Sequence, residues 1–220
     1  MKEFKPLFSE NSDFLPEEPL GESLLAKESP EFRIWEPKST IIVLGRSQKA
    51  DKEIFLDASK EDKVPVFKRY GGGGCVVLDE NSVCIAFRYD RGASIDITSF
   101  MEYSTKAIQS FLNETYDLGV EVKENYDLTI DSKKFLGSSL YMPKGLCLYS
   151  AVLLMNKKAL PKINKYLKFP TKVPEHRKGR NHADFLIPLQ TLIDDSNAAF
   201  MAKMKSYLQD SKFLNGPKKV

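Results

Sequence analysis

Lys68-Arg69-Tyr70-Gly71-Gly72-Gly73-Gly74-Cys75-Val76-Val77-Leu78-Asp79 carries the strongest structural signal in the chain. Four consecutive glycines remove every β-carbon from one side of a turn, so a ligand can lie directly against backbone N–H groups. Arg69 stands just before them and can pair with a phosphate or a carboxylate. The closing Gly-Lys-Ser/Thr of a phosphate-binding P-loop and the spacing of a dinucleotide-binding loop are both absent. The stretch therefore indicates either an anion-binding loop or a flexible hairpin tip.

Short apolar runs border the glycines on both sides. Residues 40–44 are mostly β-branched, which is typical of a buried strand, and residues 65–67 predict the strand that enters the glycine loop. Residues 75–78 predict the strand that leaves the loop, and residues 82–87 predict a third strand. Because these runs follow one another closely, we expect the centre of the fold to be an antiparallel meander.

The remaining elements follow from hydrophobic periodicity. Apolar runs predict further strands over residues 32–36, 120–122, 127–130, 134–141 and 146–155. Apolar positions at helical spacing predict helices over residues 16–25, 51–60, 99–116, 160–167 and 189–208. An irregular arm over residues 1–15 and a tail over residues 211–220 leave residues 16–210 as a single domain, which suits a chain of 220 residues.

Composition restricts the classes of protein to which the chain can belong. The 33 Lys and Arg residues are scattered among 30 Asp and Glu residues, and the net charge is only +3, which argues against a dedicated nucleic-acid-binding protein. No apolar run approaches the length that spans a membrane, and the N-terminus lacks the apolar region of a secretory signal. Three cysteines do not make the disulfide framework of a secreted domain. We therefore expect a cytoplasmic protein that binds neither nucleic acid nor membranes.

Three motifs occur in order along the chain: Gly45-Arg46-Ser47-Gln48, the glycine stretch from Lys68 to Asp79, and Asp127-Leu128 followed by Lys134-Phe135-Leu136-Gly137-Ser138-Ser139. Together they resemble the catalytic domain of the lipoate–protein ligase family, which is grouped with the lipoyl and octanoyl transferases and the biotin–protein ligases. The resemblance extends from about Pro16 to Leu189. It implies an α/β (α+β) fold of the class II biotin/lipoate ligase type, with a mixed, largely antiparallel central sheet flanked by helices.

This resemblance implies an enzyme that uses ATP to activate lipoate, or octanoate, as an acyl-adenylate. It also implies transfer of the acyl group to a lysine of a lipoyl carrier domain, of the 2-oxoacid dehydrogenase E2 type or the glycine cleavage H protein type. By its motif, Lys134 corresponds to the family's catalytic lysine, and Lys133 is the spare lysine of the turn. Forming a mixed anhydride brings carboxylate and phosphate oxygens together, and a fixed ammonium lowers their repulsion.

The resemblance also assigns the other residues of the site. Those expected to bind ATP and the acyl-adenylate are Arg69, Gly72, Gly73, Gly74, Cys75, Val76, Val77, Lys134 and Gly137. Arg46, Asp79 and Asp127 are further candidates for the same pocket. Mg²⁺ is expected wherever ATP is cleaved, but the sequence shows no cluster of acidic ligands, and we assign no metal-binding residue.

Four positions depart from the residues that the family usually carries. Gly71 stands in place of a serine, Leu78 and Tyr149 in place of histidines, and Tyr126 in place of an asparagine. We expect these positions to lie around one pocket. The changes leave open an alternative in which the chain is a catalytically inactive relative that binds a ligand or a carrier.

A cysteine-dependent transferase is the other enzymatic alternative. Such enzymes pass the acyl group through a cysteine thioester and use no ATP. Cys75 follows the glycines and is the best-placed thiol, whereas Cys84 and Cys147 lie inside apolar strands, where cysteine is usually inert packing. No cysteine lies just upstream of Asp127 or in the loop after Pro170, where related transferases carry one. The ATP-dependent ligase is therefore favoured.

The segment 172–182 is the most basic part of the chain. It predicts either a solvated loop or a functional segment, which would be a flap over the acyl-adenylate or a contact for an acidic carrier domain. A nucleic-acid-binding role, the alternative from another class, would also depend on it. Its two histidines, His176 and His182, are too isolated to indicate a metal site. After Leu189 we expect one helix and a tail and no C-terminal accessory domain, so either that domain is a separate protein or this member does without it.

Overall fold

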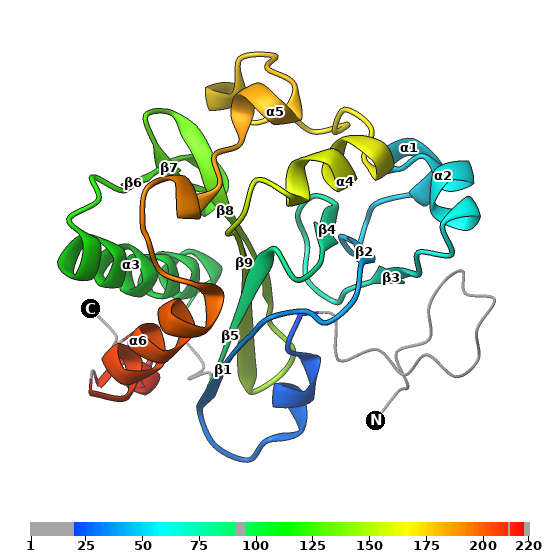
Figure 1. Ribbon diagram of the computed structural model, residues 1–220. Helices are drawn as coiled ribbons and strands as arrows, with labels where there is room; N and C mark the ends of the chain where they lie inside the picture. The colour runs from blue at the N-terminus through cyan, green and yellow to red at the C-terminus, as the bar shows by residue number, and fades with distance from the viewer. Residues whose placement is uncertain (1–19, 91–95, 211, 218–220) are drawn as a thin grey trace.

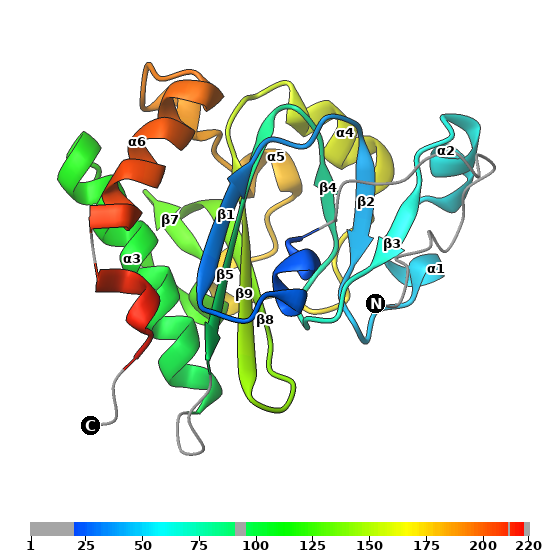
Figure 2. The same cartoon turned by 90° about the horizontal axis from the view of Figure 1, so that it is seen from below.

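The structure is a computed structural model that describes residues 20–90, 96–210 and 212–217 of the chain (Figure 1). The arm expected over residues 1–15 and the start of the helix expected from residue 16 lie outside the described residues. The described chain forms two stacked sheets, with helices on the outer side of each (Figure 2). This layered arrangement buries both faces of each sheet.

The larger sheet has six strands and is antiparallel throughout. In spatial order its strands are β1 (Glu31–Trp35), β5 (Ser82–Asp90), β9 (Leu146–Leu154), β8 (Lys133–Tyr141), β7 (Leu128–Ile130) and β6 (Glu121–Val122). The central strand β5 is apolar on both faces, since Val83 and Phe87 pack into one core cluster and Cys84 and Ala86 into another. Burial on both faces explains why this strand reads as a continuous apolar run.

The smaller sheet has three strands. In spatial order they are β3 (Val66–Lys68), β2 (Ile41–Leu44) and β4 (Val76–Leu78). The central β2 pairs in parallel with β3 and antiparallel with β4. Its side chains alternate, so that Ile41 and Val43 pack toward the larger sheet while Ile42 and Leu44 pack toward the helices.

The antiparallel meander expected at the centre is therefore wrong. Between β2 and β3 the chain passes through α1 (Ala50–Glu53) and α2 (Leu56–Glu61), and a crossover of that length permits a parallel neighbour. The third expected strand, β5, joins the larger sheet, where its two apolar faces are both covered. The local pattern of apolar residues indicates that a strand is buried on both faces, but it does not indicate which strand lies beside it.

Helices cover the outer faces of both sheets (Figure 2). The larger sheet is covered by α3 (Ile97–Tyr116) and α6 (Asn197–Asp210), and the smaller sheet by α1, α2 and α4 (Ala159–Tyr166). Asp96 caps α3 by accepting a hydrogen bond from the Ser99 N–H at 2.8 Å. Short helical turns complete the chain: η1 (Glu22–Ala26), η2 (Glu124–Tyr126), η3 (Glu175–Arg177), α5 (His182–Phe185), η4 (Leu189–Thr191) and η5 (Lys212–Asn215).

Most expected strands and helices are confirmed with small shifts at their ends. The helix expected over residues 51–60 is interrupted at Ile54, because Ile54 forms an antiparallel bridge with Leu167. The helix expected over residues 189–208 is divided into η4 and α6, and the described part of the one expected over residues 16–25 contains the short η1. The fold class is confirmed as a mixed α+β domain whose large antiparallel sheet is flanked by helices. None of the described helices is long and apolar enough to cross a membrane.

Candidate active site

The glycine loop, residues 69–75, joins β3 to β4 and lies against β8. A β-carbon on Gly71 would lie 3.0 Å from Ser139 Oγ, and one on Gly45 would lie 2.0 Å from the carbonyl oxygen of Gly73. Gly73 also has a φ of +90°, a backbone conformation that favours glycine. The glycines therefore permit the close approach of three backbone segments, which larger residues would push apart.

Arg69 lies beneath the glycine loop and holds its carbonyl groups. The residue is only 5% exposed. Its guanidinium donates to the carbonyl oxygen of Gly72 at 2.7 and 3.1 Å, to that of Gly74 at 2.7 Å and to that of Val43 at 3.4 Å. Burial lowers the pKa of Arg69 to about 10, which still leaves it charged at neutral pH. Arg69 thus organises the loop from inside, since its guanidinium is bonded to carbonyl groups of the protein, and its expected contact with a nucleotide stays a prediction.

Holding the carbonyl groups inward turns backbone N–H groups outward. The C=O and N–H of a trans peptide point in opposite directions, so the N–H groups of Gly73 and Cys75 are directed away from Arg69. Among the described residues, we find no acceptor for the N–H groups of Gly72, Gly73, Gly74 and Cys75. The loop therefore presents a set of free backbone donors of the kind that binds anions.

Lys134 lies near the start of β8, in a hairpin with β7. Asp131 and Ser132 form the turn, with φ values of 49° and 60°, the left-handed pair of a two-residue hairpin. The register then shifts, which leaves Phe135 as an extra residue in β8 next to Lys134. A β-bulge of this kind bends the strand and redirects the side chains beside it.

The hairpin brings Lys134 to Asp127. Lys134 Nζ lies 2.7 Å from Asp127 Oδ1, and the side chains are 26% and 5% exposed, respectively. The lysine side chain crosses Gly137, where a β-carbon would lie 2.9 Å from Nζ. The next residue, Ser138, has its carbonyl oxygen 3.7 Å from the place of a β-carbon on Gly73. The ammonium group and the glycine loop therefore lie on the same stretch of β8.

A third side chain reaches Asp127 from the basic segment. His176 Nε2 lies 3.3 Å from Asp127 Oδ2, and the His176 side chain is 11% exposed. Sequence reasoning considered His176 only as a metal ligand and missed this contact. No spacing or composition signal connects a histidine of this loop with the start of β7, so only the tertiary structure reveals the pair.

Three other residues of the expected site support the loop through the smaller sheet. The Arg46 N–H donates to the Gly71 carbonyl at 2.9 Å, whereas its side chain is exposed. Val76 pairs with Val43 of β2, and the buried Val77 packs into the cluster under α4. These contacts fasten both ends of the glycine loop to the sheet.

Asp79 lies outside the site. Its carboxylate is buried, contacts Lys162 Nζ at 2.7 Å and accepts from the Asn81 N–H at 2.9 Å. Asp79 follows Leu78 at the end of β4 opposite the glycine loop. The structure therefore places Asp79 in an ion pair with Lys162 of α4, and its candidate role in the pocket stays a prediction.

The surroundings of the three cysteines disfavour a reactive thiol. Cys75 packs against the apolar cluster under α4, and burial raises the pKa of its thiol to about 12. Cys84 is fully buried in β5, where burial raises its pKa further, and Cys147 is fully buried in β9. A thiol with a raised pKa is almost wholly protonated at neutral pH and is a poor nucleophile. The observation weighs against the cysteine-dependent transferase.

The four positions that depart from the family's residues differ in their surroundings. Leu78 and Tyr149 are fully buried in the core clusters, where Tyr149 contacts the Thr105 hydroxyl at 3.2 Å. Gly71 lies against β8, and Tyr126 packs against the larger core. Leu78 therefore alters core packing alone, whereas the buried hydroxyl of Tyr149 lies near Ser138 and Asp127 of the candidate site.

His182, at the start of α5, gives the site a testable pH dependence. Burial lowers the pKa of His182 below its ordinary value of 6.5, and the nearby Arg177 and Lys134 add to this shift. His182 therefore binds a proton more readily in the unfolded chain than in the folded chain. The free energy of unfolding should accordingly fall as the pH drops through about 6.5. Urea unfolding between pH 7.5 and pH 5.5 should show this loss, and His182→Gln should flatten it. An unchanged slope in the variant would show that His182 is not the group responsible.

The described residues do not fit a metal ion held by the protein alone. No three His, Cys, Asp or Glu side chains among them are grouped so as to hold one. Asp127 is paired with Lys134, and Asp79 is paired with Lys162. A metal ion could therefore bind at this site only if a bound substrate supplied some of its ligands.

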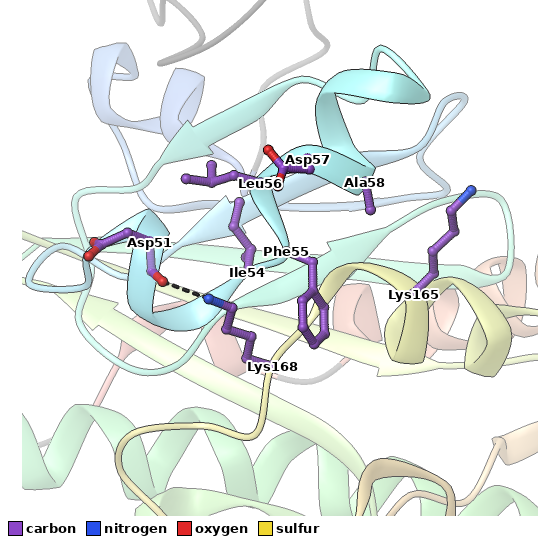
Figure 3. A pocket seen from close by; sticks show the side chains of 8 residues that line it. All are labelled: Asp51, Ile54, Phe55, Leu56, Asp57, Ala58, Lys165 and Lys168. Atoms are coloured by element: carbon purple, nitrogen blue, oxygen red, sulfur yellow. Dashed lines mark hydrogen bonds between the residues drawn. The ribbon is translucent and has the colours of Figure 1, made fainter.

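A hollow of about 680 Å³ lies away from Lys134, between α1, α2 and α4 (Figure 3). Among the side chains around it, Lys168 Nζ donates to the Asp51 carbonyl oxygen at 2.8 Å. Its lining residues are Asp51, Ile54, Phe55, Leu56, Asp57, Ala58, Lys165 and Lys168. None of the expected site residues lines it, so the hollow is separate from the candidate active site.

Comparison with known proteins shows that the sequence and the fold are similar to those of lipoate–protein ligases. A lipoate-protein ligase A subunit 1 of Thermoplasma acidophilum is 28% identical over 125 residues, covering 52% of this chain and 47% of that protein. The structure of a bi-partite lipoate protein ligase from the same organism matches with a TM-score of 0.70 at 22% identity, over 82% of this chain and 70% of that one. The structure of lipoate-protein ligase A bound with ATP matches with a TM-score of 0.65 at 21% identity, over 84% and 78%.

The sequence match is partial with respect to the relatives' length. A probable lipoate-protein ligase A of Mycoplasma pneumoniae is 32% identical over 133 residues, which are 60% of this chain but only 38% of that protein. The family model, in contrast, covers most of this chain, since the lipoyl protein ligase A/B catalytic domain matches residues 16–209. The chain therefore belongs to the family of the lipoyl protein ligase A/B catalytic domain.

Proposed function

We propose that this chain activates lipoate, or a related acid such as octanoate, as an acyl-adenylate with ATP and transfers the acyl group to a lysine of a lipoyl carrier domain. One observation carries the proposal. The Lys134 ammonium, held 2.7 Å from Asp127, lies on the same stretch of β8 as a glycine loop whose backbone donors are free. Such a site suits a reaction in which a carboxylate and a phosphate must be brought together.

In the first step, a carboxylate oxygen of the acid attacks the α-phosphorus of ATP. A phosphorus–oxygen bond forms, the bond to the leaving pyrophosphate breaks, and pyrophosphate takes the electron pair. The free N–H groups of the glycine loop would bind oxygens of the α-phosphate, and Lys134 would lie between carboxylate and phosphate, lowering their repulsion. Mg²⁺ would enter as the complex with ATP, since it is commonly held by substrate phosphates with few protein ligands.

In the second step, the amine of the carrier lysine attacks the acyl carbon. A carbon–nitrogen bond forms, the carbon–oxygen bond to AMP breaks, and AMP leaves with the electron pair while the amine loses a proton. The product is an amide on the carrier. Lys134 would favour this step as well, because its ammonium stabilises the charge that develops on the departing phosphate.

The charge of the surface and the similarity to known ligases support two proposed partners, a lipoyl carrier domain and an accessory protein. Lys172 and Lys178 of the basic segment are exposed, which suits a carrier domain rich in acidic residues, of the E2 or H-protein type. The Thermoplasma ligase is described as bi-partite and is paired with its E2 lipoyl domain. We propose by analogy that a separate accessory-domain protein assists activation by this chain. The three free cysteines suit a reducing compartment such as the cytoplasm.

Mass spectrometry of a lipoyl carrier domain tests the proposal. The carrier is incubated with the chain under three conditions: with lipoate and ATP, with preformed lipoyl-adenylate, and with octanoyl-carrier as donor in the absence of ATP. We expect modification of the carrier lysine in the second reaction, and in the first reaction at a rate that an accessory protein would raise. The third reaction should yield nothing, because the surroundings of the three cysteines disfavour a reactive thiol.

The three reactions separate the alternatives. Acyl transfer from octanoyl-carrier without ATP would replace the ligase with a cysteine-dependent transferase. Failure of all three reactions, with or without an accessory protein, would favour a relative that only binds a ligand or a carrier. Robust ligation of free lipoate by the isolated chain would remove the need for an accessory protein but leave the ligase assignment intact.

A further inference from the structure

His176 belongs to a segment that is fastened over the β7–β8 hairpin. The Glu175 N–H donates to Glu124 Oε2 at 2.9 Å, which ties the segment to the turn before β7. Arg180 Nη2 donates to the Ser132 carbonyl at 2.8 Å and to the His176 carbonyl at 2.7 Å. These contacts hold the backbone of residue 176 directly beside the hairpin that carries Lys134.

The imidazole ring lies between an apolar and a polar partner. Its centroid is 5.4 Å from that of the Phe185 ring, which belongs to α5. On the other side, Nε2 approaches Asp127 Oδ2 at 3.3 Å. Both ring nitrogens are buried, and neither makes a hydrogen bond with a described residue, so the approach to Asp127 falls short of one. Buried nitrogens without hydrogen bonds are costly, which points to a state in which one of them is bonded.

Two side chains with N–H groups therefore lie beside the carboxylate of Asp127. Lys134 Nζ lies 2.7 Å from Oδ1, and His176 Nε2 lies 3.3 Å from Oδ2. In the proposed reaction the ammonium must turn from Asp127 toward the carboxylate and phosphate of the substrates. That move would leave a carboxylate that is only 5% exposed without its counter-ion, and a buried unpaired charge is strongly unfavourable.

We infer that His176 is a positioning residue that donates a hydrogen bond to Asp127 when Lys134 turns to the substrates. This inference rests on the proposed function. A small approach of the ring would let the Nε2–H donate to Oδ2, since the nitrogen is already 3.3 Å from that oxygen. The donor keeps the carboxylate bonded in both positions of the lysine and thereby makes the movement of the ammonium less costly. His176 would act through Asp127 and touch no substrate.

Two variants of His176 separate this role from packing. His176→Phe keeps a ring against Phe185 but has no nitrogen, whereas His176→Gln supplies an N–H at about the same distance along the side chain. We expect His176→Phe to lower kcat for adenylate formation roughly ten-fold with little change in KM, and His176→Gln to recover most of the loss. Wild-type kcat in the Phe variant, or an equal loss in both variants, would overturn the inference.

A second measurement needs no catalysis. Acetylation of the full chain, followed by mass spectrometry, gives the ratio of labelling at Lys134 to labelling at its exposed neighbour Lys133. Without His176 the carboxylate depends on Lys134 alone, so the ratio should fall several-fold in His176→Phe and stay near the native value in His176→Gln. An unchanged or higher ratio in His176→Phe would contradict the inference. The labelling result stands even if the native chain forms no adenylate, which would contradict the proposed function.

Discussion

Replacement of Lys134 with methionine should greatly slow acyl-adenylate formation, and it should also lower the free energy of unfolding because Asp127 loses its counter-ion. Methionine keeps an unbranched side chain of similar length over Gly137 but removes the charge that lies 2.7 Å from Asp127. Loss of one charged or hydrogen-bonding group that stabilises a transition state commonly lowers kcat by about 10²–10³-fold. The effect is measured as pyrophosphate release in the presence of lipoate and ATP. The proposed accessory protein is added to the assay if the chain needs it for activation.

Lys133→Met is the matched control. Lys133 is the preceding residue of β8 and is exposed, so its side chain extends to the opposite side of the strand from Lys134. The control should retain the activity and melting temperature of the native chain. Equal losses in the two variants would show that the positive charge of the turn, and not the position of Lys134, supports the reaction.

Substitution of Gly45 with alanine should displace the glycine loop and destabilise the domain. The new β-carbon would lie 2.0 Å from the carbonyl oxygen of Gly73 and 3.0 Å from its carbonyl carbon. These are backbone atoms that cannot rotate aside, so either the end of β2 or the loop must move. Overpacking of this kind costs about 1–3 kcal/mol, which urea unfolding would detect. Nucleotide binding, measured by calorimetry, should weaken as well because the free N–H groups of the loop would be misaligned.

Gly119→Ala serves as the control for that substitution. Gly119 is exposed, and a β-carbon there meets no atom within 4 Å. The control should change the free energy of unfolding by no more than about 0.5 kcal/mol and leave nucleotide binding unchanged. A stable Gly45→Ala variant that binds nucleotide normally would show that the approach of Gly45 to Gly73 is not required.

Motifs that lie within one short stretch of chain were predictable. The glycine loop, the strands on either side of it and the strand that carries Lys134 are each defined by adjacent residues, and the structure has all of these elements near the expected residues. Helix α3 was predictable for the same reason, since its apolar side chains recur at helical spacing and bury one face. In each case neighbours in sequence are also neighbours in space.

Contacts between distant segments were not predictable. The direction of the Arg69 guanidinium depends on carbonyl groups of its own loop and of β2, and the sequence offered a phosphate as an equally good partner. Asp79 and Asp127 are both acids beside an expected pocket, yet one pairs with α4 and the other with Lys134. A charged side chain pairs with whichever opposite charge the fold brings near, and that choice leaves no local trace.

The sequence by itself determined that a glycine-rich loop and a lysine hairpin exist, because turn chemistry and strand periodicity are properties of adjacent residues. Only the tertiary structure decided that β3 lies parallel to β2, that Arg69 turns the loop's N–H groups outward, and that Lys134 and His176 share one carboxylate. Those arrangements depend on the stacking of two sheets and on a loop folded over a hairpin. The packing of whole elements sets them, and no single stretch of the chain encodes them.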